Sequence, residues 1–187
     1  MAKRILLLAS GTGSLASAIL SAIEAGTISA ECVGVISDKD SLALEVARSF
    51  GIPDFLVPMQ SARSEWDLEI LECARRLSPD LIVSVGFMRL LAPDFVSIFK
   101  VINTHPSLLP LYPGAHAVGD ALAAKATGTG ATVHWVDSGL DTGAVISRRT
   151  VEIREDDDEA TLHERIKIVE RALIVETLAE YGESGTL

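Results

Sequence analysis

The chain has 187 residues, of which 48% are hydrophobic and 22% are charged, and its formal net charge is −10. This composition excludes a disordered, collagen-like or coiled-coil chain, and the length indicates one globular domain. The excess of acidic residues argues against non-specific binding to nucleic acid or to an anionic membrane, although a helix N-terminus can still bind a small phosphate group.

Alternating strand and helix patterns run through the first hundred residues. A continuous apolar run predicts a strand that is buried on both faces over residues 5–9. Further strands are predicted over residues 32–37, 54–57, 81–85 and 101–104. Helical spacing or helix-end signals predict helices after residue 14, over 41–50, from 64 to 78 and over 93–99. Ser64 with Asp67 three residues later indicates a variant capping box at the start of the third helix.

The second part of the chain continues this alternation after an irregular loop. Three prolines and one glycine in residues 106–116 indicate a rigid connection. A helix over 117–126, strands over 131–136 and 144–153, and a long helix from near Asp156 follow. The acidic residues 155–159 suit the N-terminus of that helix.

These elements predict one α/β domain over residues 1–187, with a Rossmann-like, mostly parallel sheet covered by helices on both faces. Ligands of such sheets bind beyond the carboxyl ends of the strands. We therefore expect the functional residues in the loops 10–14, 86–91, 103–116 and 137–143.

The two cysteines are too few for a disulfide framework and indicate a reducing compartment. The apolar stretch over residues 5–9 is too short for the core of a secretion signal, and no apolar run is long enough to span a membrane. We therefore expect a cytoplasmic protein.

The sequence SGTGS (10–14) lies between the first predicted strand and helix. Gly11 and Gly13 allow a tight turn whose free amides can bind a phosphate group at the helix N-terminus. With Ala16 and Asp38 the segment also fits a dinucleotide fingerprint, and a plain tight turn is a third interpretation. The lysine of an NTP-hydrolysing phosphate loop is missing from this motif.

Asn103 and His105 are two residues apart in an extended segment, so their side chains share one face. They offer an amide donor and a titratable imidazole, and the prolines that follow stiffen the segment. Asp137 and Asp141 in the segment DSGLDTG are typical turn residues. If this loop faces the same edge of the sheet, one of the two aspartates reaches His105, fixes its tautomer and stabilises its protonated form.

The remaining histidines carry less information. The four histidines and the acidic residues lack the compact spacing of a metal site, so we expect none. His134 lies in a predicted strand, where a histidine is more often a hydrogen-bonding partner than a catalyst. His163 is expected on the surface of the last helix.

The chain resembles the folate-dependent formyltransferases over essentially its whole length. The segments that carry the resemblance are SGTGS (10–14), RSEWD (63–67), GFMRLL (86–91), INTHPSLLPLYPGAH (102–116), GATVHWVDSGLDTGAVI (130–146) and ERIKIVERAL (164–173). The His-Pro-Ser sequence at 105–107 and Pro-Gly at 113–114 are similar to the branch that formylates phosphoribosylglycinamide (GAR), rather than to the branch that formylates methionyl-tRNA.

The resemblance implies that 10-formyltetrahydrofolate is a co-substrate, that no cofactor is tightly bound, and that the formyl group passes to GAR in purine biosynthesis. It implies small-molecule partners, with neither nucleic acid nor membrane, in a monomer or homodimer. Residues 1–100 would form a phosphate-binding half, and residues 101–187 a catalytic and folate-binding half, of the same domain.

The resemblance also assigns site residues by position. The implied catalytic residues are Asn103, His105 and Asp141. The implied GAR-binding residues are Gly11, Thr12, Gly13, Ser14, Leu15, Lys167 and Glu170. The implied folate-binding residues are Arg63, Met88, Arg89, Leu90, Leu91, Asn103, Asp137, Ser138, Gly139, Leu140 and Asp141.

In the implied reaction, Asn103 and a protonated His105 donate hydrogen bonds to the formyl oxygen, and Asp141 assists proton transfer through a water molecule. Some positions depart from the pattern common in the family, including Thr12, Leu15, Leu111, residues 118–119 and Lys167. A lysine at 167, where glutamine is common, would add positive charge near the ribonucleotide.

Two other functions fit part of the sequence. One is formyl transfer to a different amine, such as that of a nucleotide-linked sugar. The other is a dinucleotide-binding or regulatory module, which would use Gly11, Gly13, Ala16 and Asp38 and leave Asn103, His105 and Asp141 without a role.

Overall fold

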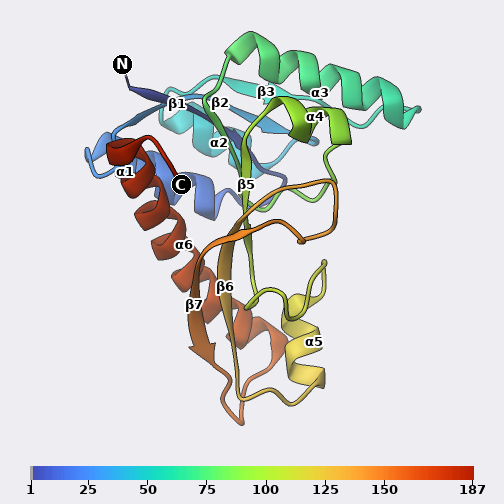
Figure 1. Ribbon diagram of the computed structural model, residues 1–187, viewed down its shortest axis with the longest axis vertical. Helices are drawn as coiled ribbons and strands as arrows, with labels where there is room; N and C mark the ends of the chain where they lie inside the picture. The colour runs from blue at the N-terminus through green and yellow to red at the C-terminus, as the bar shows by residue number, and fades with distance from the viewer. Residues whose placement is uncertain (1) are drawn as a thin grey trace.

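Seven strands form one sheet, in the order β3-β2-β1-β4-β5-β6-β7, in the computed structural model, which describes residues 2–187 (Figure 1). The strands are β1 (Lys3–Leu8), β2 (Ala30–Ser37), β3 (Asp54–Leu56), β4 (Leu81–Ser84), β5 (Val101–His105), β6 (Gly128–Trp135) and β7 (Val145–Glu152). Strands β1 to β5 are parallel, whereas β6 and β7 pair in antiparallel fashion. The mostly parallel sheet predicted from the sequence is confirmed.

Helices cover both faces of this sheet, as predicted. The helices are α1 (Ser14–Glu24), α2 (Leu42–Ser49), α3 (Arg63–Leu77), α4 (Pro93–Ile98), α5 (Ala117–Ala123) and α6 (Glu159–Ser184). Ile5 and Leu7 of β1 belong to the core shared with α1, α2, α5 and α6. Leu6 and Leu8 point to the opposite face, where they belong to the core that contains Trp66 of α3 and residues of α4. Burial on both faces explains the uninterrupted apolar run of β1.

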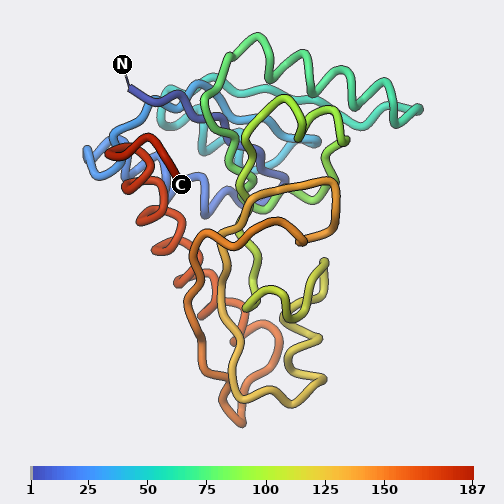
Figure 2. Tube along the Cα trace, in the orientation of Figure 1, coloured from blue at the N-terminus to red at the C-terminus, as the bar shows by residue number. Residues whose placement is uncertain are grey.

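Helix α6 connects the two ends of the molecule. The tube in Figure 2 shows it running from the side of α1 to the region of β6 and β7, and it contacts α1, β5, β6 and β7. Leu162, Ile166 and Leu173, three of the apolar residues at helical spacing, are buried. One face of α6 therefore packs on the sheet, and residues near its N-terminal end come close to the loops that follow the strands.

The structure corrects one predicted helix start and refines another. Helix α3 begins at Arg63 with Ala62 as its N-cap, so the capping box expected from Ser64 and Asp67 is wrong. Ser64 lies inside the first turn, and Asp67 instead accepts a hydrogen bond from Arg63 Nε at 2.7 Å, an (i, i+4) ion pair. The long last helix begins at Glu159, where Asp158 and Thr161 form a reciprocal capping box.

Among residues 2–187, no helix combines the length and the apolar character needed to cross a bilayer.

The packing of α6 generates a prediction about stability. Ile174 is fully buried, whereas Ile168 on the same helix is 60% exposed. We expect Ile174→Ala to lower the free energy of unfolding by about 2–5 kcal/mol, because it removes buried methyl groups and leaves a cavity. Ile168→Ala is the matched control and should change it by less than about 0.5 kcal/mol. Urea denaturation measures both, and equal losses would contradict the assigned packing.

Candidate active site

A cavity of about 500 Å³ lies at the carboxyl ends of the parallel strands. Its walls come from all four loop regions that the sequence singled out, and from α6. Every predicted site residue except Arg63 lines this cavity. Residues from both halves of the chain contribute to it, so the cavity is one site built by the whole domain.

Arg63 stands outside the cavity, at the start of α3. Its guanidinium donates to the carbonyl oxygen of Leu90 and to Asp67, and it lies 4.9 Å from the centre of the Trp66 ring. Arg63 therefore supports the segment 88–91 from outside the cavity.

His105 and Asp141 form the centre of the site. His105 ends β5 and is 5% exposed. Its Nε2 donates to the carbonyl oxygen of Tyr112 at 2.8 Å, and its Nδ1 lies 3.4 Å from Asp141 Oδ2. The same carboxylate oxygen accepts a hydrogen bond from the Gly114 amide at 2.8 Å. Both ring nitrogens therefore face acceptors, and this holds the imidazole in one orientation.

The path of the loop between β6 and β7 decides between the two candidate aspartates. Asp141 adopts a left-handed conformation with φ 55°, which brings its carboxylate to His105. Asp137 instead accepts hydrogen bonds from Gly139 N at 2.9 Å and Thr142 Oγ1 at 2.7 Å. These bonds lower the pKa of Asp137. Asp137 is thus a turn residue that also borders the cavity.

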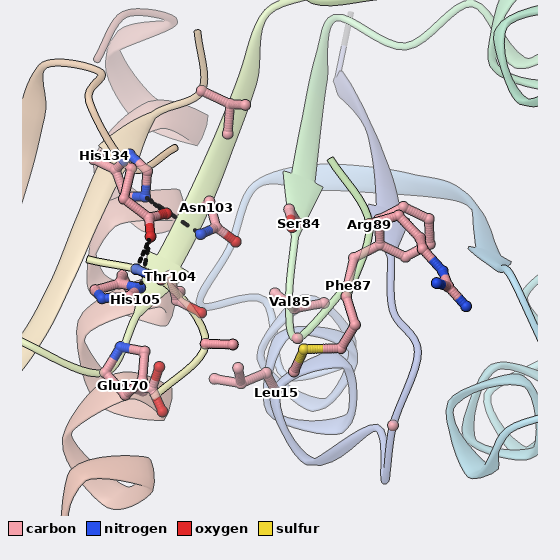
Figure 3. A pocket seen from close by; sticks show the side chains of 18 of the residues that line it. Leu15, Ser84, Val85, Phe87, Arg89, Asn103, Thr104, His105, His134 and Glu170 are labelled. Carbon is pink, nitrogen blue, oxygen red and sulfur yellow. Dashed lines mark hydrogen bonds and ion pairs between the residues drawn. The ribbon is translucent and has the colours of Figure 1, made fainter. Parts of the chain in front are cut away.

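His134 belongs to the same cluster, although the sequence did not assign it to the site. It lies opposite Asn103 in the antiparallel pairing of β6 with β5, and Figure 3 shows the two side chains pointing toward each other. His134 Nδ1 donates to the Trp135 carbonyl oxygen at 2.8 Å, so its Nε2 can accept from Asn103 Nδ2 at 3.3 Å. Burial lowers the pKa of His134, which favours this neutral form. The register that creates this contact has no signal in the local sequence.

Helix α1 begins at the other end of the cavity. Gly13 is its N-cap with φ 74°, and a Cβ there would lie 2.8 Å from the Ala43 Cα, so only glycine fits. Among the described residues, no side chain caps this helix start. The amides of its first turn therefore remain available to an anion in the cavity.

Helix α6 contributes residues at (i, i+4, i+7) spacing to the cavity wall: His163, Lys167 and Glu170. His163, expected on the surface of the helix, is half-buried and faces this cavity. Burial and the nearby Lys167 charge lower the pKa of His163. The helical spacing could have placed His163 in the site, because His163 lies on the same helix face as Lys167 and Glu170, which were already assigned to it.

Glu170 is 5% exposed and lies near Thr104 of β5. Burial raises the pKa of Glu170 to about 7, against the opposing effect of the Lys167 and Arg171 charges. Among residues 2–187, the buried Thr104 hydroxyl is close enough to Glu170 to lower its pKa slightly, but it has no partner at good hydrogen-bonding geometry. The pair gives this part of the cavity hydrogen-bonding capacity for a polar ligand.

The structure removes the basis for the dinucleotide interpretation. The side chain of Asp38 is 1% exposed, and both its oxygens are engaged, by Ser10 Oγ and by Arg89 Nε, each at 2.6 Å. A ribose-binding acid must present its carboxylate to the ligand. The described residues also contain no group of three or more His, Cys, Asp or Glu side chains placed to hold a metal ion.

Comparisons with known proteins agree with one another. The Formyl transferase family model matches residues 3–178. A phosphoribosylglycinamide formyltransferase of Mycobacterium tuberculosis is 45% identical over 186 residues, which cover 97% of this chain and 86% of the relative. The crystal structure of glycinamide ribonucleotide transformylase 1 from Symbiobacterium toebii has a TM-score of 0.94 at 33% identity, over 97% of this chain and 88% of that one. The chain therefore belongs to the formyl transferase family.

The burial of Glu170 predicts a pH-dependent stability. Its pKa is about 7 in the folded chain, against a usual value of 4.5, so folding favours the protonated form. The stability contribution of that form is complete below pH 4.5 and is lost as the pH rises through 7. The loss approaches about 3 kcal/mol at pH 8.

The neutral variant Glu170→Gln avoids this loss. Its free energy of unfolding relative to the unsubstituted chain should therefore rise between pH 5 and pH 8, as measured by urea denaturation at both values. Glu180→Gln, at an exposed position on the same helix, serves as the control. An equal difference at both pH values for Glu170→Gln would contradict this effect of burial.

Proposed function

We propose that this member of the formyl transferase family transfers the formyl group of 10-formyltetrahydrofolate to the amine of GAR, a step of purine biosynthesis. The observation that carries the proposal is the convergence of Asn103, His105 and Asp141 on one cavity that also contains an uncapped helix N-terminus. The names of the similar proteins support this choice of acceptor.

The acceptor would bind between α1 and α6. Its phosphate group would accept hydrogen bonds from the amides of the turn 11–15, at the positive end of the α1 dipole. Lys167, whose side chain is 33% exposed and whose Nζ lies 2.7 Å from Glu164 Oε1, would turn its positive charge toward the phosphate in a protein whose net charge is −10. Glu170 and Thr104 would meet the hydroxyl groups of the ribose. The glycinamide amine would then point toward His105.

The formyl donor would bind against the opposite wall. Met88, Leu90 and Leu140 line the cavity with side chains 71%, 60% and 52% exposed. Exposed apolar side chains gathered at one cavity are typical of a ligand-binding surface. They would cover the flat ring system of the folate and place its formyl group beside Asn103.

The reaction would proceed by direct attack. The neutral amine forms a bond to the formyl carbon, and negative charge develops on the formyl oxygen. The amide nitrogen of Asn103 has a second N–H for this oxygen, beyond the one that faces His134. The Nδ1–H of a protonated His105 would share its hydrogen bond between this oxygen and Asp141. The 3.4 Å contact with Asp141 is long for a charge-assisted hydrogen bond and leaves room for sharing.

Asp141 would stabilise the protonated His105 and orient a water molecule. That water would carry a proton from the attacking amine to the folate nitrogen as the carbon–nitrogen bond of the donor breaks. The nearby Ser107 is unsuited to an acyl-enzyme route, because it is fully buried and its hydroxyl donates to the Leu111 carbonyl oxygen.

A steady-state assay with GAR and 10-formyltetrahydrofolate tests the proposal. We expect His105→Ala and Asp141→Asn each to lower kcat by about 10²–10³-fold, because each weakens stabilisation of the oxyanion or proton transfer. His116→Ala, at an exposed position outside the cavity wall, should retain normal turnover. Circular dichroism checks that the variants are folded. Near-normal kcat in either folded site variant, or faster transfer to an amine without a phosphoribosyl group, would refute the proposal.

The role of Lys167 generates a separate prediction. Lys167→Ala should raise KM for GAR by about 10–100-fold, the usual effect of losing a hydrogen bond to a charged group, and leave KM for the folate unchanged. With an acceptor that lacks the phosphate, the variant and the unsubstituted enzyme should have the same KM. Lys100→Ala, on the exposed surface outside the cavity, is the matched control. An unchanged KM for GAR would exclude contact between Lys167 and the phosphate.

A further inference from the structure

One buried carboxylate connects the loops that follow three neighbouring strands. Asp38 comes directly after β2, and its Oδ1 accepts a hydrogen bond from Ser10 Oγ at 2.6 Å, beyond β1. Its Oδ2 accepts from Arg89 Nε at 2.6 Å, beyond β4. The Ser10 hydroxyl oxygen in turn accepts from the Met88 amide at 3.2 Å. We call Ser10, Asp38 and Arg89 the loop tie.

The loop tie joins the two walls assigned above to different substrates. Ser10 immediately precedes the turn 11–15, where the phosphate of the acceptor would bind. Met88 and Arg89 belong to the segment 86–91, which forms the folate wall. Figure 3 shows Arg89 across the cavity from Asn103 and His134. Asp38 therefore lies behind the substrate walls and away from the reacting groups, and Arg89 reaches it from the folate wall.

The segment 86–91 is held by two apolar anchors and by polar contacts. It contains no helix or strand, and Met88 and Leu90 are more than half exposed. Phe87 stacks on the Trp66 ring and Leu91 packs on the same core, so residues 88–90 between them gain little order from apolar burial. The polar contacts that hold it are those of the loop tie, the Ser10 amide to the Gly86 carbonyl oxygen, and Arg63 to the Leu90 carbonyl oxygen.

The charge of Asp38 strengthens the tie. Burial alone would raise the pKa of this carboxyl, but the hydrogen bonds from Ser10 and Arg89 outweigh that effect and lower it. Asp38 is thus an ionised group at 1% side-chain exposure, and its two partners compensate the charge. A buried carboxylate with fixed donors has one favourable arrangement, so it holds its partners in place.

We propose that Asp38 is a positioning residue for formyl transfer, which locks the folate wall to the phosphate-binding turn before either substrate arrives. This proposal rests on the proposed function. A wall ordered in advance binds its ligand without the entropic loss of ordering a loop. Loosening the tie should therefore weaken binding of the folate, while Asn103, His105 and Asp141 across the cavity retain their chemistry.

Asp38→Asn is the direct test, because it keeps the shape and one acceptor for Ser10 but removes the charge that holds Arg89. We expect KM for 10-formyltetrahydrofolate to rise about tenfold, kcat to stay within about threefold, and KM for GAR to rise less. In the free protein, hydrogen exchange should become faster in the peptide that covers residues 86–91. Asp54→Asn is the matched control, since it breaks the Arg48–Asp54 ion pair of 2.8 Å outside the cavity.

A double variant tests whether Asp38 and Arg89 act on folate binding through the same ion pair or independently of each other. Asp38→Asn combined with Arg89→Gln should bind the folate no more weakly than Arg89→Gln alone, because both changes break the same ion pair. If the two effects multiply, the positioning proposal is wrong. It is also overturned if Asp38→Asn lowers kcat with both KM values unchanged.

These measurements separate a failure of the positioning proposal from a failure of the proposed function. If the unsubstituted enzyme transfers formyl groups to GAR and Asp38→Asn has normal KM values and normal exchange, only the positioning role is wrong. If the unsubstituted enzyme shows no such transfer, the proposed function is wrong, and hydrogen exchange still decides whether the tie orders the segment. Should Asp38→Asn fail to fold, Ser10→Ala decides by the same measurements, because it removes the acceptor of the Met88 amide and keeps the Asp38–Arg89 ion pair.

Discussion

The antiparallel pairing of β6 with β5 is the constraint on which the candidate site depends. It places His134 opposite Asn103 at the end of the sheet where the parallel strands also finish. The connection to β7 begins after Trp135, which pairs with Ile102 near the start of β5, and it returns along the sheet so that Asp141 reaches the His105 imidazole. The register of this pairing and the path of the loop thus bring an amide, two imidazoles and a carboxylate into one cavity.

Similar buried groups in and behind this cavity have different properties. His134 and His105 are both nearly inaccessible to solvent, and each has one nitrogen on a backbone carbonyl oxygen and the other near Asp141, at 3.6 Å and 3.4 Å. They differ in that Nε2 of His134 also lies 3.3 Å from the Asn103 amide nitrogen. Glu170 and Asp38 are both buried carboxyls. Glu170 lacks a close cationic donor and has a raised pKa, while Asp38 has two donors and a lowered pKa. The partners of each group, rather than its residue type, determine its charge.

Much of this arrangement could be predicted from the sequence. Uninterrupted apolar runs identified the parallel strands, because burial on both faces requires them. The rule that ligands bind beyond carboxyl ends identified the loops that line the cavity, and the family resemblance then supplied residues within them. The local pattern left Asp137 and Asp141 as equal candidates to contact His105, because the choice depends on one left-handed backbone conformation, and only the family resemblance pointed to Asp141. The predicted helix start at Ser64 failed because an ion pair between Arg63 and Asp67 stabilises the first turn in place of a side-chain cap.

Contacts between distant segments escaped prediction for a common reason. Asp38, Ser10 and Arg89 are far apart in the chain, and each has an ordinary local interpretation. Only the order of β2, β1 and β4 in the sheet brings the three together. His134 is a similar case, because its partner is set by strand register. A single sequence specifies burial patterns well, whereas pairing between strands requires the whole fold.

The left-handed backbone of Asp141 (φ 55°) has a consequence for how this enzyme can evolve. A residue with a side chain adopts this conformation at a penalty of roughly 1–2 kcal/mol, which glycine avoids. Selection for thermostability alone would therefore favour glycine at position 141, whereas the proposed role of this carboxylate in turnover would oppose glycine. On that proposal the chain keeps a strained residue at position 141, and gains in heat resistance come from other positions.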